Sequence, residues 1–272
     1  MRKLVISPLC ERGGRLTAYL HDLDGLYIKR GPRPGMLVIP GGGYSKIVDR
    51  EGDSVAFEFF TAGFNTFVLE YSVRPDNSDL PPLGLTPLVQ ASSAIIHIRE
   101  NAKEWDTNEN QIAVVGFSAG GHLAGSCGCM WNCPELNELM NTFDGKNRPD
   151  AVVMGYPVVL AGELSHGSSI INLAGNNSDP FYDLTTHVGD HVPPTFLWTT
   201  MEDQLVPCEN TLLYTLALRK HNIPFELHVY THGPHGLTLG LPETMRINRH
   251  AATWLPLCKK WLGDMFGFDV SI

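Results

Sequence analysis

The sequence contains no run rich in lysine or arginine, and no apolar stretch near the ~20 residues that a membrane-spanning helix needs. Its 29 acidic and 20 basic residues give a formal net charge of -9. Binding to a nucleic-acid backbone requires a basic surface, which this charge disfavours. We therefore expect neither a nucleic acid nor a membrane among the partners of this chain.

Cysteine is too sparse for a disulfide scaffold, with six in 272 residues. Cys127, Cys129 and Cys133 cluster, but their C-x-C-x3-C spacing is not that of a zinc site, so we expect buried structural thiols. Residues 4–10 form an apolar run behind two basic residues. This run is shorter than the core of a signal peptide and contains Pro8, so we expect a cytoplasmic protein.

Apolar runs alternate with helical patterns along the chain, which predicts an α/β fold. The expected strands are residues 5–7, 16–20, 36–39, 65–71, 111–115, 151–156, 195–200 and 225–230. The expected helices are residues 53–62, 88–105, 121–127, 210–220 and 245–261. This alternation predicts a mostly parallel, doubly wound sheet with helices on both faces and an antiparallel start at one edge.

The length fits one domain, residues 1–272, with no separate cap domain. Residues 160–194 have no clear periodicity and are rich in glycine, serine and asparagine. An irregular segment of this length in a compact domain is usually functional. We expect it to form a lid or a pocket wall.

Residues 116–120 read G-x-S-x-G between an expected strand and an expected helix. That context is typical of a nucleophile elbow, in which Ser118 sits on a strained turn and the amide of Ala119 faces a developing oxyanion. The alternative is a glycine-rich turn with an ordinary serine.

Two more polar residues follow strands in the order Ser…Asp…His. Asp203 comes after residues 195–200, and His235 comes after residues 225–230. The carboxyl ends of parallel strands share one edge of the sheet, where functional loops gather. A histidine can activate a serine hydroxyl when a carboxylate fixes its tautomer.

Each of these positions has an alternative. Glu202 competes with Asp203 as the orienting acid, and His232 competes with His235 as the base. The H-x3-H pair at residues 187–191 is a weak metal candidate, because Gly189-Asp190 indicates a loop, and we expect no metal.

The triple glycine at residues 41–43 follows a buried strand, as a phosphate-binding loop does. However, G-G-G-Y-S-K matches neither the dinucleotide nor the P-loop pattern. We interpret it as the second arm of an oxyanion hole and expect no cofactor.

Four motifs together resemble small bacterial esterases of the α/β-hydrolase superfamily, over nearly the whole chain. They are residues 40–44 (P-G-G-G-Y), residues 117–122 (F-S-A-G-G-H), residues 203–207 (D-x-x-V-P) and residues 233–236 (G-P-H-G). The resemblance is greatest to acetyl esterases and acetyl-xylan esterases, which are relatives of the lipase and feruloyl-esterase-like families.

The resemblance implies Ser118 as nucleophile, His235 as base and Asp203 as orienting acid. It also implies oxyanion donors at Gly42, Gly43 and Ala119. Pro40 stands where many relatives carry the histidine of H-G-G-G, which leaves open whether Gly42 or Gly43 donates.

The leading hypothesis is a serine carboxylesterase that hydrolyses short acyl esters, acetylated sugars among them, through an acyl-enzyme. A peptidase or aryl-formamidase of the same fold and a non-catalytic ligand-binding relative are the alternatives. Bulky aromatics near the nucleophile would favour a short acyl group, and we expect such wall residues at Tyr44, Trp131, Phe181 and Tyr182. The partner is then a small-molecule ester, and the oligomeric state stays open, a homo-oligomer included.

Overall fold

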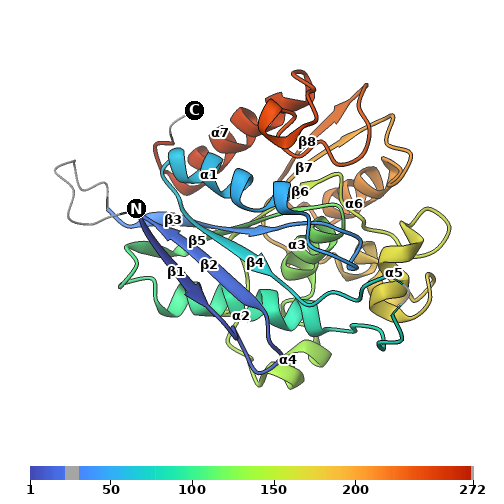
Figure 1. Cartoon of the computed structure of the whole chain (residues 1–272), viewed down its shortest axis with the longest axis horizontal. Helices are drawn as coiled ribbons and strands as arrows, with labels where there is room; N and C mark the ends of the chain where they lie inside the picture. Colours follow the sequence, from blue (N-terminus) through green and yellow to red (C-terminus); the bar gives the residue numbers. More distant parts are fainter. Residues whose placement is uncertain (22–30, 77, 271–272) are drawn as a thin grey trace.

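The computed structural model describes residues 1–21, 31–76 and 78–270. The expected domain limits of 1–272 also include residues 22–30, 77 and 271–272, which lie outside the described residues. In the described part, an eight-stranded sheet has the order β1-β2-β4-β3-β5-β6-β7-β8 (Figure 1). Its strands are β1 (Arg2–Ile6), β2 (Arg15–Leu20), β3 (Arg33–Ile39), β4 (Asn65–Glu70), β5 (Thr107–Phe117), β6 (Ala151–Gly155), β7 (Thr195–Thr200) and β8 (Phe225–Tyr230).

The β1 and β2 strands pair antiparallel, and β2 pairs antiparallel with β4. All pairs from β4 to β8 are parallel. The mostly parallel sheet with an antiparallel edge is therefore confirmed. Parallel pairing places the carboxyl ends of β3 and β5 to β8 at one edge, and the loops that follow them meet there.

Alternate residues of the central strands enter two different cores. Leu37 and Ile39 of β3 belong to one buried cluster, and Met36 and Val38 belong to the other. A period of two sends successive side chains to opposite faces of a sheet. Because both faces are covered, the strand reads as one continuous apolar run.

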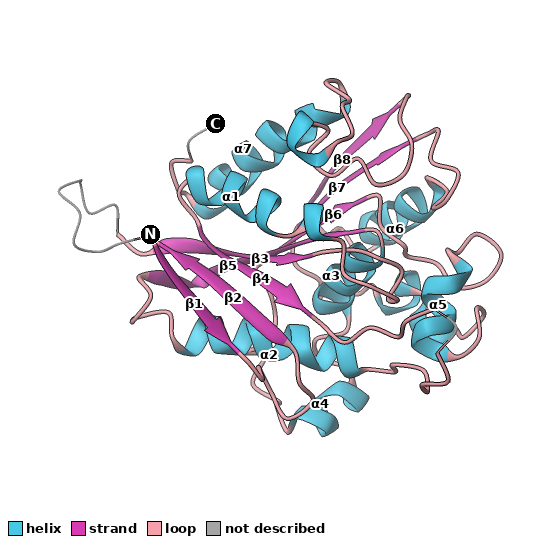
Figure 2. Ribbon diagram, in the orientation of Figure 1, coloured by secondary structure: helices cyan, strands magenta, loops and turns pink. Residues whose placement is uncertain are grey.

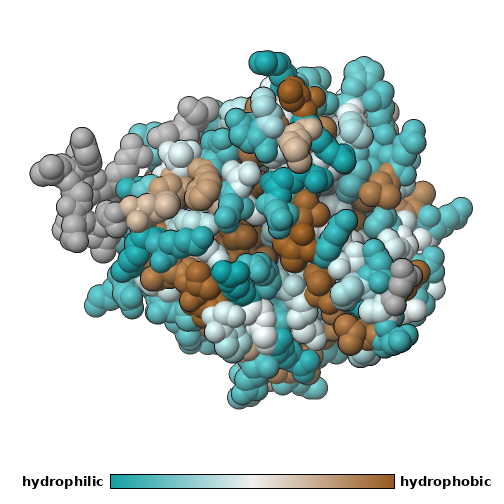
Figure 3. All heavy atoms as spheres, in the orientation of Figure 1, coloured by the Kyte–Doolittle hydropathy of each residue, from teal (hydrophilic) through white to brown (hydrophobic). Residues whose placement is uncertain are grey.

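Helices cover both faces of the sheet (Figure 2). The α1 (Asp53–Thr61) and α7 (Trp254–Phe266) helices pack against one face. The α2 (Thr86–Glu100), α3 (Ala119–Cys129) and α6 (Glu209–Lys220) helices pack against the other. On the side seen in Figure 3, apolar residues form several separate groups among polar ones. No helix in the described ranges is long and apolar enough to cross a bilayer.

Four expectations about helices need correction. The helix expected at residues 88–105 begins at Thr86 and ends at Glu100, and a turn follows it. The last helix begins at Trp254 rather than at Met245, because Met245 is left-handed (φ 57°) and caps a short 3-10 turn. No helix was expected between residues 127 and 151, but α4 (Pro134–Met140) lies there. The segment 160–194 is not wholly irregular, since it contains α5 (Gly167–Ala174) and two 3-10 turns.

Candidate functional site

Ser118 sits between the end of β5 and the first residue of α3. Its backbone has φ 55° and ψ -120°, outside the regions that a residue with a Cβ ordinarily adopts. Such a conformation costs about 1–3 kcal/mol and persists only when the surroundings hold it. Here the Ser118 N–H donates to Gly155 O at 3.0 Å, and the Ser118 carbonyl accepts from Val158 N at 3.1 Å.

The glycines on either side of Ser118 are required by close backbone contacts. A methyl group built on Gly116 would lie 2.0 Å from Gly120 O, and one built on Gly120 would lie 2.2 Å from Ile39 O. Any side chain at either position would push α3 away from the sheet. The G-x-S-x-G spacing therefore describes the sharp strand-to-helix turn that was expected.

A chain of two hydrogen bonds joins Ser118, His235 and Asp203. His235 Nε2 lies 2.8 Å from Ser118 Oγ, and His235 Nδ1 lies 2.7 Å from Asp203 Oδ2. A carboxylate can only accept, so Nδ1 carries the proton and donates it to Asp203. Nε2 is then free to accept the serine hydroxyl. The three residues follow β5, β8 and β7, as the strand order predicts.

Asp203 is held in place by its own loop. Its side chain is fully buried (0% exposed), and its Oδ1 accepts from Leu205 N at 3.0 Å and from Val206 N at 2.9 Å. These two bonds orient the carboxylate so that Oδ2 points toward His235. The histidine itself is 15% exposed.

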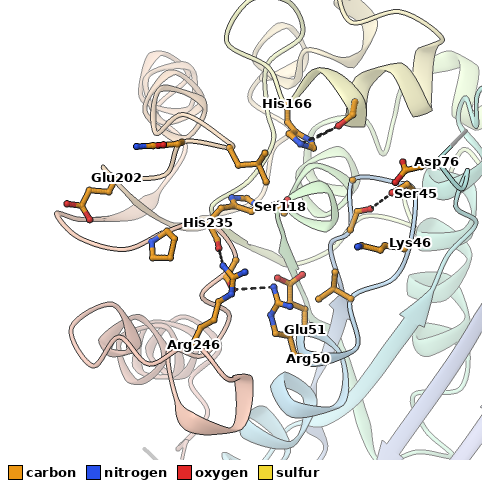
Figure 4. Close-up of a pocket in the computed structure, with 18 of the residues that line it drawn as sticks. Ser45, Lys46, Arg50, Glu51, Asp76, Ser118, His166, Glu202, His235 and Arg246 are labelled. Carbon is orange, nitrogen blue, oxygen red and sulfur yellow. Dashed lines mark hydrogen bonds between the residues drawn. The ribbon is translucent and has the colours of Figure 1, made fainter.

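Glu202 and His232, the alternative candidates for the acid and the base, form a hydrogen bond with each other. Glu202 Oε1 lies 2.8 Å from His232 Nδ1, and Glu202 Oε2 accepts from Gly233 N at 3.0 Å. The bond from His232 lowers the pKa of Glu202. Both side chains are exposed, and Glu202 points away from Ser118 (Figure 4). Neither residue takes part in the hydrogen-bond chain of Ser118.

Ser118 and His235 border a cavity of about 930 Å³ at the carboxyl edge of the sheet. Polar residues and glycines dominate its lining. The other lining residues are Gly42, Gly43, Ser45, Lys46, Val48, Arg50, Glu51, Asp76, His166, Ser168, Met201, Glu202, Gln204, Leu205, Pro234, Gly236 and Arg246 (Figure 4).

The expected oxyanion donors lie beside this cavity. Gly42 and Gly43 line it, and the Gly42 carbonyl closes a turn by accepting from Ser45 N at 3.0 Å. Ala119 occupies the first position of α3, where a backbone N–H has no acceptor within the helix. A partial positive charge at that helix end favours an anion.

Glu51 is a buried link that the sequence reasoning missed. It is 2% exposed, and it accepts hydrogen bonds from Gly41 N and from the Tyr156 hydroxyl, both at 2.8 Å. The Tyr156 hydroxyl accepts in turn from Thr238 N at 3.0 Å, and the Tyr156 ring packs edge-on against His235 with centroids 4.9 Å apart. Glu51 thus connects the glycine loop to the loop that carries His235. No motif marks a lone glutamate for this position.

The four aromatic residues expected at the pocket are not among those that line the cavity. Tyr44 is buried (1% exposed), with its hydroxyl 2.9 Å from His122 Nδ1. Phe181 and Tyr182 pack edge-on against each other beside the core. Trp131 donates to His191 O at 3.3 Å. His166 and Ser168, from the segment 160–194, line the cavity instead.

His122 ties the elbow helix to two loops. Its Nε2 lies 3.0 Å from Tyr182 O, which can only accept, so Nε2 carries the proton and Nδ1 accepts from the Tyr44 hydroxyl. Burial lowers the pKa of His122 to about 4, so the ring is neutral near pH 7. The elbow motif contained this residue, but its partners could not be predicted.

The two histidines of the H-x3-H pair lie against backbone carbonyl groups. His187 Nε2 lies 2.9 Å from Phe181 O, and His191 Nε2 lies 2.8 Å from Cys129 O. Within the described ranges, no three His, Cys, Asp or Glu side chains are grouped as a metal site would require. The clustered cysteines 127, 129 and 133 are free and buried, as expected.

The chain matches a known protein family and two known proteins. The model of the BD-FAE family matches residues 26–218. Endo-1,4-beta-xylanase B of Butyrivibrio fibrisolvens is 38% identical over 237 residues, which are 84% of this chain and 35% of that protein. An acetylxylan esterase of Xylanibacter ruminicola is 30% identical over 212 residues, 74% of this chain and 40% of that protein. The chain thus spans well under half the length of either relative.

A solved structure covers the chain more completely. The acetyl ester-xyloside bifunctional hydrolase of Caldicellulosiruptor lactoaceticus is 34% identical and superposes with a TM-score of 0.77, over 97% of this chain and 92% of that one. This likeness and the strand order confirm the expected α/β-hydrolase fold.

Proposed function

The chain belongs to the BD-FAE family, and from this premise we propose that it is a serine carboxylesterase acting on short acyl esters. The observation that carries the proposal is the hydrogen-bond chain from Ser118 through His235 to Asp203. The names of two similar proteins, an acetylxylan esterase and an acetyl ester-xyloside hydrolase, support acetylated sugars as substrates.

In this proposal Ser118 is the nucleophile. His235 Nε2 takes the hydroxyl proton as Oγ attacks the ester carbonyl, and Asp203 stabilises the imidazolium that forms. The carbonyl oxygen becomes an oxyanion that Ala119 N–H and the N–H of Gly42 or Gly43 can bind. His235 then gives its proton to the departing alcohol, which leaves an acyl group on Ser118. Water, activated by the same histidine, releases the acid.

The segment 160–194 acts as a pocket wall in this proposal, because its residues His166 and Ser168 line the cavity. Burial lowers the pKa of His166, so its ring is neutral near pH 7. His166 Nδ1 lies 2.7 Å from Ser169 Oγ, which fixes the ring at the start of α5. A neutral imidazole at this place can exchange hydrogen bonds with sugar hydroxyls.

Ser118→Ala tests the function directly. We expect kcat for p-nitrophenyl acetate to fall by roughly three to six orders of magnitude, as removal of a nucleophilic serine does, while the fold is retained. A fluorophosphonate probe should label the native protein and not the variant. If the alanine protein keeps more than about a tenth of the activity, Ser118 is not the nucleophile.

Two experiments distinguish an esterase from the alternative functions. A peptidase or aryl-formamidase would turn over anilides or formamides faster than matched esters. A ligand-binding relative without catalysis would leave the fluorophosphonate probe unreacted. We expect esters to be the faster substrates and the probe to react at Ser118.

The single domain of 1–272, the cytoplasmic location and a homo-oligomeric state stay predictions. One cooperative unfolding transition, followed by two independent probes, would support a single domain. Cell fractionation tests the location, and light scattering gives the oligomeric state.

A further inference from the structure

Two arginines from distant parts of the chain meet on the wall of the Ser118 cavity. Arg50 lies in the 3-10 turn Asp49–Glu51, and Arg246 follows the turn Pro242–Thr244. Arg50 Nη2 donates to Gly236 O at 3.4 Å, and Arg246 Nη1 donates to His235 O. Figure 4 shows the two guanidinium groups extending toward each other beside His235.

Gly236 shows how closely the two groups converge. Its φ of 78° is left-handed, and a methyl group built on it would lie 2.9 Å from Arg50 Nη2 and 3.5 Å from Arg246 Nη1. Both guanidinium groups therefore lie over the backbone of the residue that follows His235. A ligand bound to them would lie directly beside the catalytic base of the proposed reaction.

Within the described ranges, neither guanidinium is paired with an acidic side chain. Among the residues that the structure describes, no carboxylate lies within 4.0 Å of Arg50 or Arg246, whereas Arg15 and Arg99 are paired with Glu70 and Asp150. A guanidinium has five N–H donors, and one donation to protein is found for each of the two. The wall thus carries two positive charges with unused donors in a chain of net charge -9.

The carboxylates around the cavity form their hydrogen bonds with other groups than these two arginines. Glu51 turns to Gly41 and Tyr156, and Glu202 turns to His232 and Gly233. Asp76 lies near Ser45, across the cavity from Arg246 (Figure 4). The positive charge beside His235 is therefore available to a bound anion.

We propose that Arg50 and Arg246 bind a carboxylate on the alcohol portion of the substrate, so that acyl esters of uronic acids are preferred to esters of neutral sugars. The assignment rests on the proposed esterase function. His235 gives its proton to the departing alcohol, so the alcohol portion lies on the His235 side of the cavity, where the two arginines are. The planar guanidinium matches a carboxylate with two parallel hydrogen bonds.

The first test compares two substrates that differ only at C6, which is a carboxylate in one and a hydroxymethyl group in the other. These are an acetylated methyl glucuronide and the matching methyl glucoside, acetylated at the same hydroxyl. We expect kcat/KM of the native protein to favour the glucuronide about tenfold, as a charge-assisted hydrogen bond at a half-exposed site would give. Added salt should reduce this preference, because it screens the interaction.

In Arg50→Gln/Arg246→Gln we expect the ratio of the two kcat/KM values to fall to about one. The single variants should give intermediate ratios. Arg249→Gln is the matched control, since Arg249 is exposed, lies three residues from Arg246 and does not line the cavity. A native ratio near one, or an unchanged ratio in the double variant, would overturn the proposal.

A binding experiment separates this inference from the proposed function. Calorimetry with the Ser118→Ala protein measures the affinity for both acetylated sugars without turnover. Tighter binding of the glucuronide, lost when Arg50 and Arg246 are also replaced, supports the carboxylate site even if the native protein hydrolyses no ester. Equal binding of the two sugars overturns the site, even if esterase activity is found.

Discussion

At the residue scale, Asp203 and Glu202 are adjacent carboxylates with opposite surroundings. Asp203 is fully buried and faces His235, while Glu202 is half exposed and faces His232. Two backbone N–H groups of the turn hold Asp203 Oδ1. They place the carboxylate of Asp203, rather than that of Glu202, against the histidine that contacts Ser118.

Matched substitutions of the two acids should therefore differ in effect. We expect Asp203→Asn to lower kcat about ten-thousandfold, because an amide cannot hold the required histidine tautomer. Glu202→Gln should change kcat far less. The two histidines give the same contrast, with His235→Ala nearly inactive and His232→Ala active. Steady-state kinetics with p-nitrophenyl acetate measures all four, and equal losses for the two acids would contradict the assignment.

The sequence predicted the residues whose positions follow from backbone geometry. Ser118, Asp203 and His235 lie in the turn or loops that follow strands of one parallel sheet, so their meeting follows from the strand order. Tyr44 also follows a strand, but its ring enters the core, a direction that no local pattern specifies. Arg50 and Arg246 line the cavity because separate turns bring them together, and neither belongs to a motif.

At the scale of elements, Glu51 joins the turn before α1 to the loops after β3 and β6. Both of its oxygens accept hydrogen bonds, and an amide offers only one accepting oxygen. We expect Glu51→Gln to lower the free energy of unfolding by about 1–3 kcal/mol, the cost of an unsatisfied buried group.

The same variant should lower kcat more than it raises KM, because the glycine loop loses an anchor while the cavity wall stays. Glu70→Gln is the matched control, since Glu70 pairs with Arg15 on the surface, where such pairs contribute about 0–1 kcal/mol. Urea denaturation and steady-state kinetics measure both effects. A Glu51→Gln protein as stable and active as the Glu70→Gln protein would refute the role of Glu51.

His122 connects α3 to the glycine loop and to the turn Pro180–Tyr182, and its low pKa makes this link sensitive to pH. The unfolded chain binds more protons than the folded one between pH 6.5 and about pH 4. His122 therefore stabilises the fold fully above pH 6.5, and this contribution of about 3 kcal/mol is lost as the pH falls to about 4.

His122→Gln removes the titration and isolates its effect, because every other titrating group is common to both proteins. We expect the stability advantage of the native protein to shrink by about 3 kcal/mol as the pH falls from 6.5 to about 4. Urea denaturation along this pH series measures the difference. Parallel stability curves would show that His122 does not titrate as proposed.

The sequence predicted helices and strands best where burial of apolar side chains alone determines their position. The strands from β3 to β7 are buried on both faces, and their apolar runs located them. The start of α7 was misplaced because residues 242–253 pass through two 3-10 turns and a left-handed Met245. Helices α4 and α5 have only seven and eight residues, and α5 begins with Gly167 and two serines, which are weak helix formers.

At the scale of the whole molecule, the cavity is formed by loops from almost the full length of the chain, from Gly42 to Arg246. The strand order predicted the edge of the sheet at which it lies. Its lining could not be predicted, because side chains from five or more loops meet there only after the sheet has assembled. Apolar side chains are few among them, namely Val48, Met201, Leu205 and Pro234.

This lining determines the last prediction, which concerns the length of the acyl group. Each methylene that leaves water for an apolar wall contributes about 0.8 kcal/mol, and glycines and polar residues outnumber the four apolar residues that could form such a wall here. We expect kcat/KM for p-nitrophenyl esters to be highest for acetate and to fall toward octanoate. Rates in the Ser118→Ala protein, subtracted at each chain length, correct for spontaneous hydrolysis. A maximum at octanoate would contradict this prediction and would indicate a lipase-like enzyme instead.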